Sequence, residues 1–143
     1  MPLALLFGGA MWGASMQLPA LAFALPGRIP IALALAGLGL GFALAGVAAF
    51  RKAMTTINPM RPDGASALVT SGPYRFSRNP MYAGLLLALT GWAVHLSHLA
   101  AFLCLPPFVA YMNRFQIAPE ERVLAAKFCE EFAAYRRSVR RWL

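Results

Sequence analysis

The first 50 residues contain two long apolar segments, residues 3–25 and 29–50, and neither carries a charged side chain. A helix needs about 20 apolar residues to cross the hydrocarbon core of a bilayer, so each segment is long enough. In lipid the backbone polar groups of a segment must be satisfied internally, which favours helices. We therefore predict two membrane-spanning helices joined by a tight outer turn at Pro26-Gly27-Arg28.

A third apolar stretch, residues 81–113, holds 33 uncharged residues, which is generous for one crossing and short for two. Basic residues flank it on both sides, with Arg75 and Arg78 before it and Arg114 after it. Because basic loops gather on the cytoplasmic side of a membrane, both ends of the stretch belong there. The number of crossings in this stretch is then even.

We predict that this stretch forms two short helices, 81–96 and 98–113, which turn near His95-Leu96-Ser97-His98. The pair Pro106-Pro107 is expected to kink the second helix. With the first two segments, this predicts an all-α integral membrane protein of four helices, a single domain over residues 1–143.

The distribution of charge supports this topology. The chain has a formal net charge of +8, and twelve of its thirteen basic residues lie in two segments, 51–78 and 114–141. Only 13% of the residues are charged, against about 25% in soluble domains. This pattern follows the positive-inside rule and argues against nucleic acid as a partner. We predict a bacterial inner-membrane protein with both termini, a loop (51–79) and a tail (114–143) in the cytoplasm.

The tail is predicted to form an amphipathic helix from Pro119 that lies beneath the membrane helices or on the membrane surface. Within the second apolar segment, small residues recur every four positions, which favours helix packing over a nucleotide-binding loop. We predict that this stripe can mediate a homo-oligomer. Its members are Gly37, Gly41, Ala45 and Ala49, the first three forming the expected oligomer face.

Residues 72–84, GPYRFSRNPMYAG, place arginines, tyrosines and prolines at the start of the third apolar stretch. Asn79-Pro80 is typical of a helix N-cap followed by proline at the first helical position. The backbone amides after this cap, together with Arg75 and Arg78, suit a carboxylate or phosphate. The same residues also have structural explanations, as interfacial arginines and a helix cap.

A second polar cluster, Pro119-Glu120-Glu121, begins the tail helix. Acidic residues in a first turn complement the helix dipole, which explains them structurally. On the same membrane face as the arginines they are also suited to hold a cation or sugar hydroxyls.

These motifs resemble the isoprenylcysteine carboxyl methyltransferase and phospholipid methyltransferase superfamily, in particular its short bacterial members. The resemblance covers residues 50–143 and implies an integral membrane enzyme that transfers a methyl group from S-adenosylmethionine, leaving S-adenosylhomocysteine. The motifs that carry it are Thr55 to Pro59, Leu68-Val69-Thr70, Gly72-Pro73-Tyr74-Arg75, Arg78-Asn79-Pro80-Met81-Tyr82, Gly84, Pro119-Glu120-Glu121, Glu130-Glu131-Phe132, Tyr135-Arg136 and Val139.

The resemblance implies a cytoplasmic cofactor site in which the helix start and Arg78 hold the carboxylate of the cofactor. Glu120 and Glu121 would accept from its amino group and hydroxyls, and Tyr82 and Met112 would flank adenine. No metal site is expected. The cofactor-binding candidates are Tyr74, Arg78, Asn79, Pro80, Tyr82, Gly84, Met112, Glu120 and Glu121, and the catalytic candidates are Asn79, Glu121 and Arg75.

Two positions depart from the family pattern. Asn79 stands where the eukaryotic enzymes have histidine, so no imidazole titrates there. Cys129 stands where members usually have glycine before Glu130-Glu131, which is expected to alter the bend of the tail helix.

The chemistry of the methyl acceptor stays open from the sequence. A lipophilic amine, thiol or carboxylate would each fit, and no general base stands out. Two other functions also remain open: a nicotinamide-dependent membrane reductase, and a membrane interaction protein without enzyme activity.

Overall fold

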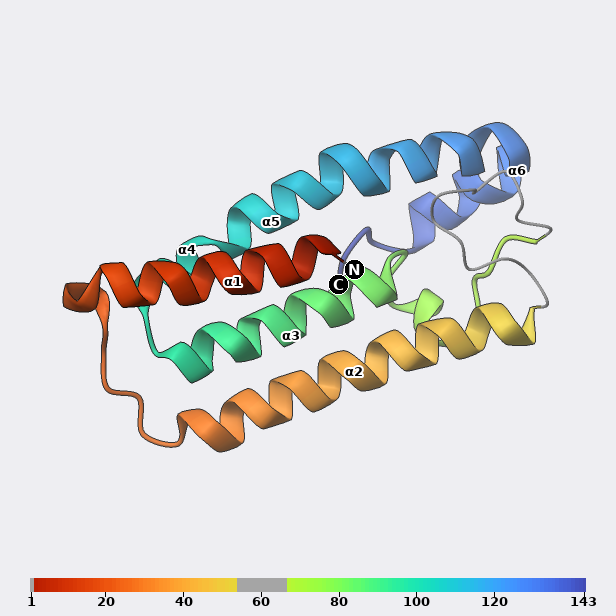
Figure 1. Ribbon diagram of the computed structural model, residues 1–143. Helices are drawn as coiled ribbons and strands as arrows, with labels where there is room; N and C mark the ends of the chain where they lie inside the picture. The colour runs from red at the N-terminus through yellow and green to blue at the C-terminus, as the bar shows by residue number, and fades with distance from the viewer. Residues whose placement is uncertain (1, 54–66) are drawn as a thin grey trace. The chain divides into compact units, whose positions relative to one another are not determined.

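The computed structural model describes residues 2–53 and 67–143, and its elements are helical throughout (Figure 1). The predicted all-α fold class is confirmed for these residues. Thr55 to Pro59 and part of the predicted loop, residues 54–66, fall outside the described residues. The elements are α1 (Pro2–Gln17), η1 (Pro19–Leu21), α2 (Arg28–Lys52), η3 (Gly72–Arg75), α3 (Pro80–Leu96), α4 (Leu99–Leu103), α5 (Leu105–Tyr111), η4 (Met112–Ile117) and α6 (Ala118–Ser138).

Helix α2 corresponds to the predicted second segment. Among the described residues it is the one helix that is long and apolar enough to cross a membrane by length and composition. Helix α3 is also apolar but has 17 residues. The four predicted crossings therefore stay a prediction, although a helix occupies most of each predicted segment.

The predicted helix over residues 3–25 ends earlier than expected, because α1 stops at Gln17. Pro19 opens a short 3-10 turn immediately afterwards, and Leu18 before it has φ −122°. A proline has no amide hydrogen to continue the helical ladder and restricts the residue before it, so the helix cannot run on. The tight turn before α2 is confirmed, with Gly27 at φ +75°.

The predicted turn after the third helix is confirmed, since α3 ends at Leu96 and Ser97 has φ +49°. The buried imidazole of His98 then caps α4 by accepting from the amide of Ala100 at 3.2 Å. The kink predicted in the helix over residues 98–113 corresponds to a break at Cys104, between α4 and α5. Pro106 and Pro107 come just after the break, where neither can donate a helical hydrogen bond.

The chain forms two compact units, and the single domain stays a prediction. The first unit comprises residues 1–40 and 84–111. Its centre is apolar: Met11 and Phe108 are fully buried, and the rings of Phe7 and Phe108 meet edge to face at 5.4 Å.

Helix packing in the first unit depends on glycines other than those predicted. A Cβ at Gly39 would lie 2.4 Å from the carbonyl oxygen of Gly84, so these helices approach backbone to backbone. By contrast, the predicted stripe residue Gly37 faces open space.

The second unit comprises residues 41–83 and 112–143. Here Gly46 lies against Met81, whereas a Cβ at Gly41 would meet no described atom within 4 Å and Ala45 is exposed. Among the described residues, the predicted stripe therefore packs within the chain at Ala49 and not at Gly37 or Gly41. Their role in an oligomer stays a prediction.

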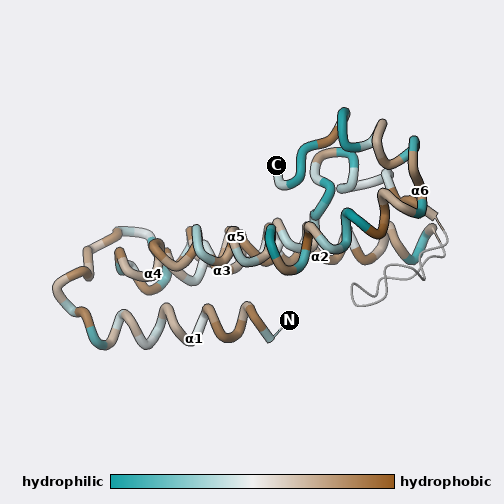
Figure 2. The backbone as a smooth tube through the Cα atoms, turned by 90° about the horizontal axis from the view of Figure 1, so that it is seen from above, coloured by the Kyte–Doolittle hydropathy of each residue, from teal (hydrophilic) through white to brown (hydrophobic). Residues whose placement is uncertain are grey.

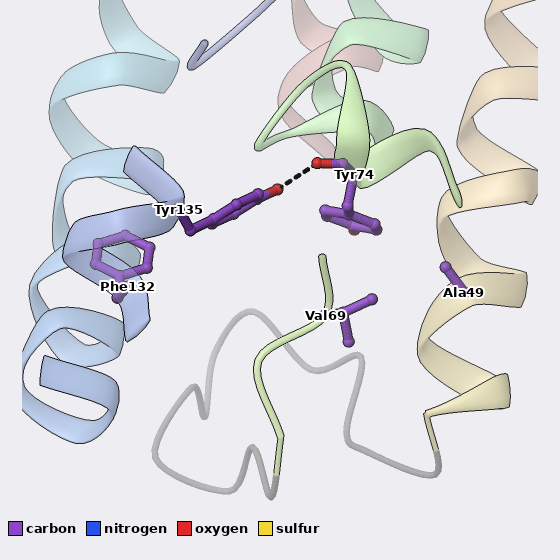
Figure 3. Packing of buried hydrophobic residues seen from close by; sticks show 5 residues of the cluster. All are labelled: Ala49, Val69, Tyr74, Phe132 and Tyr135. Atoms are coloured by element: carbon purple, nitrogen blue, oxygen red, sulfur yellow. Dashed lines mark hydrogen bonds between the residues drawn. The ribbon is translucent and has the colours of Figure 1, made fainter. Parts of the chain in front are cut away.

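A cluster of buried side chains stabilises the second unit, drawn from α2, the segment before α3, and α6 (Figure 3). The hydroxyl of Tyr135 donates to the carbonyl of Tyr74 at 2.7 Å, which ties α6 to η3. Burial raises the pKa of Tyr74 and of Tyr135, so both phenols stay protonated. The buried members of this cluster are Ala49, Val69, Tyr74, Phe132 and Tyr135.

Hydrophilic residues concentrate along α6 and the C-terminal segment, whereas α1 and α3 are mainly apolar (Figure 2). Large apolar side chains of α2 are exposed, among them Leu33, Leu38 and Leu44, each more than half accessible. A soluble surface rarely exposes so many large apolar groups along one helix, so these residues suit a lipid environment.

Candidate functional site

The turn that leads into α3 forms one side of the candidate site, which lies within the second unit. Helix α3 begins at Pro80, as predicted, and Pro80 suits the first helical position because it has no amide to satisfy. The carbonyl of Asn79 accepts from the amides of Tyr82 at 3.0 Å and Ala83 at 2.9 Å. The amide of Asn79 is in turn held by the hydroxyl of Ser77 at 3.1 Å.

The other side of the site comes from the start of α6. A π-helical segment, η4, runs directly into α6, with Met112 buried at its first position. Such a segment adds a residue to the turn and rotates the helix after it, and it often occurs at functional sites. Glu120 and Glu121 lie in the first turn of α6, as predicted.

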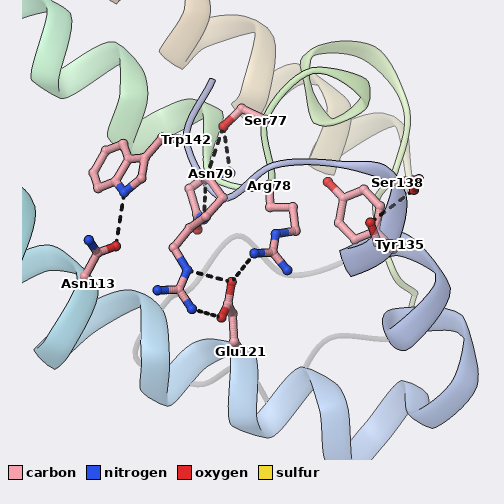
Figure 4. A network of polar contacts seen from close by, with 9 residues as sticks. Ser77, Arg78, Asn79, Asn113, Glu121, Tyr135, Ser138 and Trp142 are labelled. Atoms are coloured by element: carbon pink, nitrogen blue, oxygen red, sulfur yellow. Dashed lines mark hydrogen bonds and ion pairs between the residues drawn. The ribbon is translucent and has the colours of Figure 1, made fainter.

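Glu121 is the centre of a charged network (Figure 4). Its Oε1 lies 3.2 Å from Nη2 of Arg78, and Arg141 approaches with Nη2 at 2.5 Å from Oε2 and Nε at 3.2 Å from Oε1. The side chains of Arg78 and Glu121 are about nine-tenths buried, at 10% and 11% exposed. One buried carboxylate is thus shared by two guanidinium groups.

Arg78 has donors left over. Its Nε and Nη1 are buried and have no hydrogen-bond partner among the residues that the structure describes. Burial lowers the pKa of Arg78 and Glu121 raises it, but a guanidinium stays protonated in proteins. Buried polar atoms are nearly always paired, so these two point to a ligand that accepts hydrogen bonds.

Glu120 forms polar contacts that are separate from the charged network of Glu121. The hydroxyl of Tyr82 donates to its Oε1 at 2.6 Å, and Nε2 of Gln116 donates to the same oxygen. Burial raises the pKa of Glu120, and the two hydrogen bonds act in the opposite direction. This places a carboxyl group, a phenol and a carboxamide together at the junction of α3, η4 and α6.

Residues 140–142, which we call the C-terminal strap, return over the turn before α3. The amide of Arg78 donates to the carbonyl of Arg140 at 2.9 Å, and Nδ2 of Asn79 donates to the carbonyl of Arg141 at 2.9 Å. Nε1 of Trp142 donates to Oδ1 of Asn113 at 3.0 Å. The strap thus joins the turn to η4.

The strap, Ser77 and Gln116 were not among the residues predicted from the sequence. Several contacts of the strap use its backbone carbonyls, which any residue provides and which therefore leave no sequence signal. The basic run Arg136 to Arg141 was the available signal, and it looked like surface charge because a positive tail was already explained by topology.

Many of the predicted residues lie close together in the second unit. Others lie outside the candidate site. Tyr74 belongs to the buried cluster, and Arg75 is exposed on η3. The carbonyl of Gly84 lies against Gly39 in the first unit. The predicted residues that border the candidate site are Arg78, Asn79, Pro80, Tyr82, Glu120 and Glu121.

Comparison with known proteins identifies the family of the chain. A family model described as phospholipid methyltransferase matches residues 28–131, well over half of the chain. The chain belongs to the phospholipid methyltransferase family. Membership implies methyl transfer to membrane lipids and an association with membranes. The match includes Arg78, Glu120 and Glu121 but ends before the strap.

One relative of this chain is a protein of Haemophilus influenzae that is described as an uncharacterized protein. It is 44% identical over 63 residues, which is 44% of this chain and the whole of that protein. No solved structure matches the chain.

Proposed function

We propose that this protein transfers a methyl group from S-adenosylmethionine to a lipophilic acceptor held in the membrane, an amine, thiol or carboxylate, and releases S-adenosylhomocysteine. Family membership supports methyl transfer to lipids in general. The identity of the donor and the residues that hold it are inferred from the chemistry of the site.

The observation that carries the proposal is the pair of buried, unpartnered donors on Arg78 within the described part of the chain. Nε and Nη1 lie on different edges of the guanidinium, so each can donate a charge-assisted hydrogen bond to an anionic acceptor such as a carboxylate, and such bonds are among the strongest in proteins. The carboxylate of S-adenosylmethionine fits this requirement. Glu120, beside Tyr82, offers a carboxyl group for the amino group next to that carboxylate or for the ribose hydroxyls of the donor.

S-adenosylmethionine, when bound, supplies an electrophilic methyl group for direct displacement. The chain would then bind the donor and the acceptor, orient them and exclude water from the site. Much of the rate gain of such a transfer arises from these effects. Glu121 has both oxygens engaged by arginines, so we assign it to holding Arg78 rather than to contacting the donor. Asn79, tied to the strap, holds the turn in place.

The membrane orientation belongs to the same proposal. We place the site and both termini on the cytoplasmic face of a bacterial inner membrane, because the basic residues border the apolar segments there. The exposed leucines of α2 would face lipid, from which the acceptor enters.

Calorimetric titration of the purified protein in detergent with S-adenosylmethionine, S-adenosylhomocysteine and reduced nicotinamides tests the donor. We expect binding of the first two only, and binding weakened by about tenfold or more in Arg78→Ala, since a charge-assisted hydrogen bond is worth about 1.5–3 kcal/mol. Arg122→Ala is the matched control, because Arg122 is an exposed arginine next to Glu121. Binding of a nicotinamide alone would contradict the proposal.

Incubation with a labelled methyl donor and a bacterial lipid extract tests the transfer. Label should appear in an extractable lipophilic product with the wild type, and much less with Arg78→Ala. Label found only in water-soluble products would contradict a membrane acceptor.

A further inference from the structure

We propose that Arg141 of the C-terminal strap is a positioning residue that keeps Arg78 available to an anionic ligand by holding Glu121 away from a full pairing with it. This inference rests on the proposed function for the identity of the anion, the carboxylate of the methyl donor. The anion site itself depends only on the buried, unpartnered nitrogens of Arg78 among the described residues.

The two arginines hold Glu121 differently. Arg141 is bidentate, with Nη2 on Oε2 at 2.5 Å and Nε on Oε1 at 3.2 Å. Arg78 makes one contact, from Nη2 to Oε1 at 3.2 Å. The planar fork of a guanidinium matches a carboxylate best when two parallel bonds form, so Arg141 holds the stronger geometry.

Without Arg141, the same carboxylate would be free to turn both oxygens toward Arg78. A bidentate pair between Glu121 and Arg78 would use one of the two nitrogens that have no partner in the described residues, and it would neutralise the local charge. An incoming anion would then compete with a buried carboxylate at short range. In the native arrangement, two cations surround one anion, so the site keeps a net positive charge for the ligand.

The contacts of the strap hold Arg141 against Glu121. Its backbone carbonyls accept from the amide of Arg78 and from Nδ2 of Asn79, and Trp142 is anchored to Asn113. These contacts fix the backbone on both sides of the Arg141 side chain. That side chain is 35% exposed, so its truncation opens little space in the core.

The test measures anion binding in a double-mutant cycle of Arg141→Ala and Glu121→Gln in the full chain. The probes are S-adenosylhomocysteine, followed by calorimetry, and inorganic phosphate, followed by the ligand-induced rise in melting temperature. We expect Arg141→Ala to weaken binding of S-adenosylhomocysteine about tenfold. Adding Glu121→Gln should restore most of it, because an amide competes poorly with an anion for Arg78.

Arg140→Ala is the matched control, because Arg140 uses its backbone carbonyl, and its exposed side chain should not matter. Arg141→Lys should recover part of the affinity, because lysine pairs with Glu121 through one compact charge. It also supplies a milder variant if Arg141→Ala fails to fold.

The outcomes of this test separate the inference from the proposed function. If Arg141→Ala binds S-adenosylhomocysteine as the wild type does, Arg141 positions nothing, while the proposed function stands. If the double variant binds no better than Arg141→Ala, Arg141 acts by a direct contact or by folding the strap. If phosphate stabilises the wild type and responds to the same cycle while S-adenosylhomocysteine does not bind, the inference stands and the proposed donor is wrong. If neither probe binds the wild type, both fail.

Discussion

The two compact units differ in what their interiors are made of. Among the described residues of the first unit, the buried polar side chains are those of Ser97 and His98. Both lie in one turn and form hydrogen bonds with nearby backbone groups. In the second unit a buried carboxylate is shared by two arginines, and two nitrogens of Arg78 have no partner in the described residues. Desolvating charges costs several kcal/mol, so a chain that only had to fold would gain little from this arrangement. The difference supports our proposal that the chemistry takes place in the second unit.

The largest expected effect tests whether the apolar unit acts on stability alone. Phe108→Ala removes a fully buried ring, and we expect a loss of about 4 kcal/mol in the free energy of unfolding. Denaturant unfolding in detergent measures it. Phe115→Ala, at a 62% exposed phenylalanine, is the control and should change little. A fall in affinity for S-adenosylhomocysteine, measured where the Phe108→Ala protein is still folded, would break the proposed division between the units.

The next effect concerns the charged network. Glu121→Gln leaves two arginines around an uncharged amide, and we expect a loss of about 3 kcal/mol, at the low end for a broken buried pair because Arg141 is partly exposed. An added anion should recover part of this loss by replacing the missing charge. Thermal unfolding with and without phosphate measures both, with Glu130→Gln as an exposed control on the same helix. Equal ligand-induced stabilisation in Glu121→Gln and the wild type would contradict the shared-carboxylate interpretation.

A smaller effect concerns the kink of α6. Cys129 has φ +31° and ψ −103°, a conformation that costs a residue with a Cβ but suits glycine, as the departure from the family pattern suggested. Cys129→Gly should raise the free energy of unfolding by about 1 kcal/mol, whereas Cys129→Ala keeps the Cβ and should have no such effect. Urea titration compares the two. A loss of stability in Cys129→Gly would show that the kink is not strained.

The smallest expected effect is in the pH dependence of stability. Burial raises the pKa of Glu120 in the folded chain above its ordinary value of 4.5. The folded state then holds this proton more tightly than the unfolded state. The protonated Glu120 therefore contributes fully to stability below about pH 4.5, and this contribution falls as the pH rises through the pKa of the folded state.

Glu120→Gln should flatten that part of the profile and raise stability at neutral pH relative to the wild type. Melting temperatures between about pH 4 and pH 8 measure it. An unchanged profile would mean that Glu120 keeps an ordinary pKa, with the bonds from Tyr82 and Gln116 outweighing its burial.

The local features of this protein follow from its amino-acid sequence. Apolar runs, the Pro26-Gly27 turn and the Asn79-Pro80 helix start predicted elements that the structure contains, because hydrogen bonding and proline geometry act over a few neighbouring residues. The ordered motifs also indicated the methyltransferase family, which residues 28–131 match.

The contacts between distant residues depend on the tertiary structure. It placed Tyr74 in a core, chose Gly39 and Gly46 for close helix contacts, and set Arg141 against Glu121. Such contacts depend on how separate segments fold back on each other, and many use backbone carbonyls that every residue has. A local sequence pattern does not predict these contacts, because their free energy arises only when distant parts of the chain are brought together.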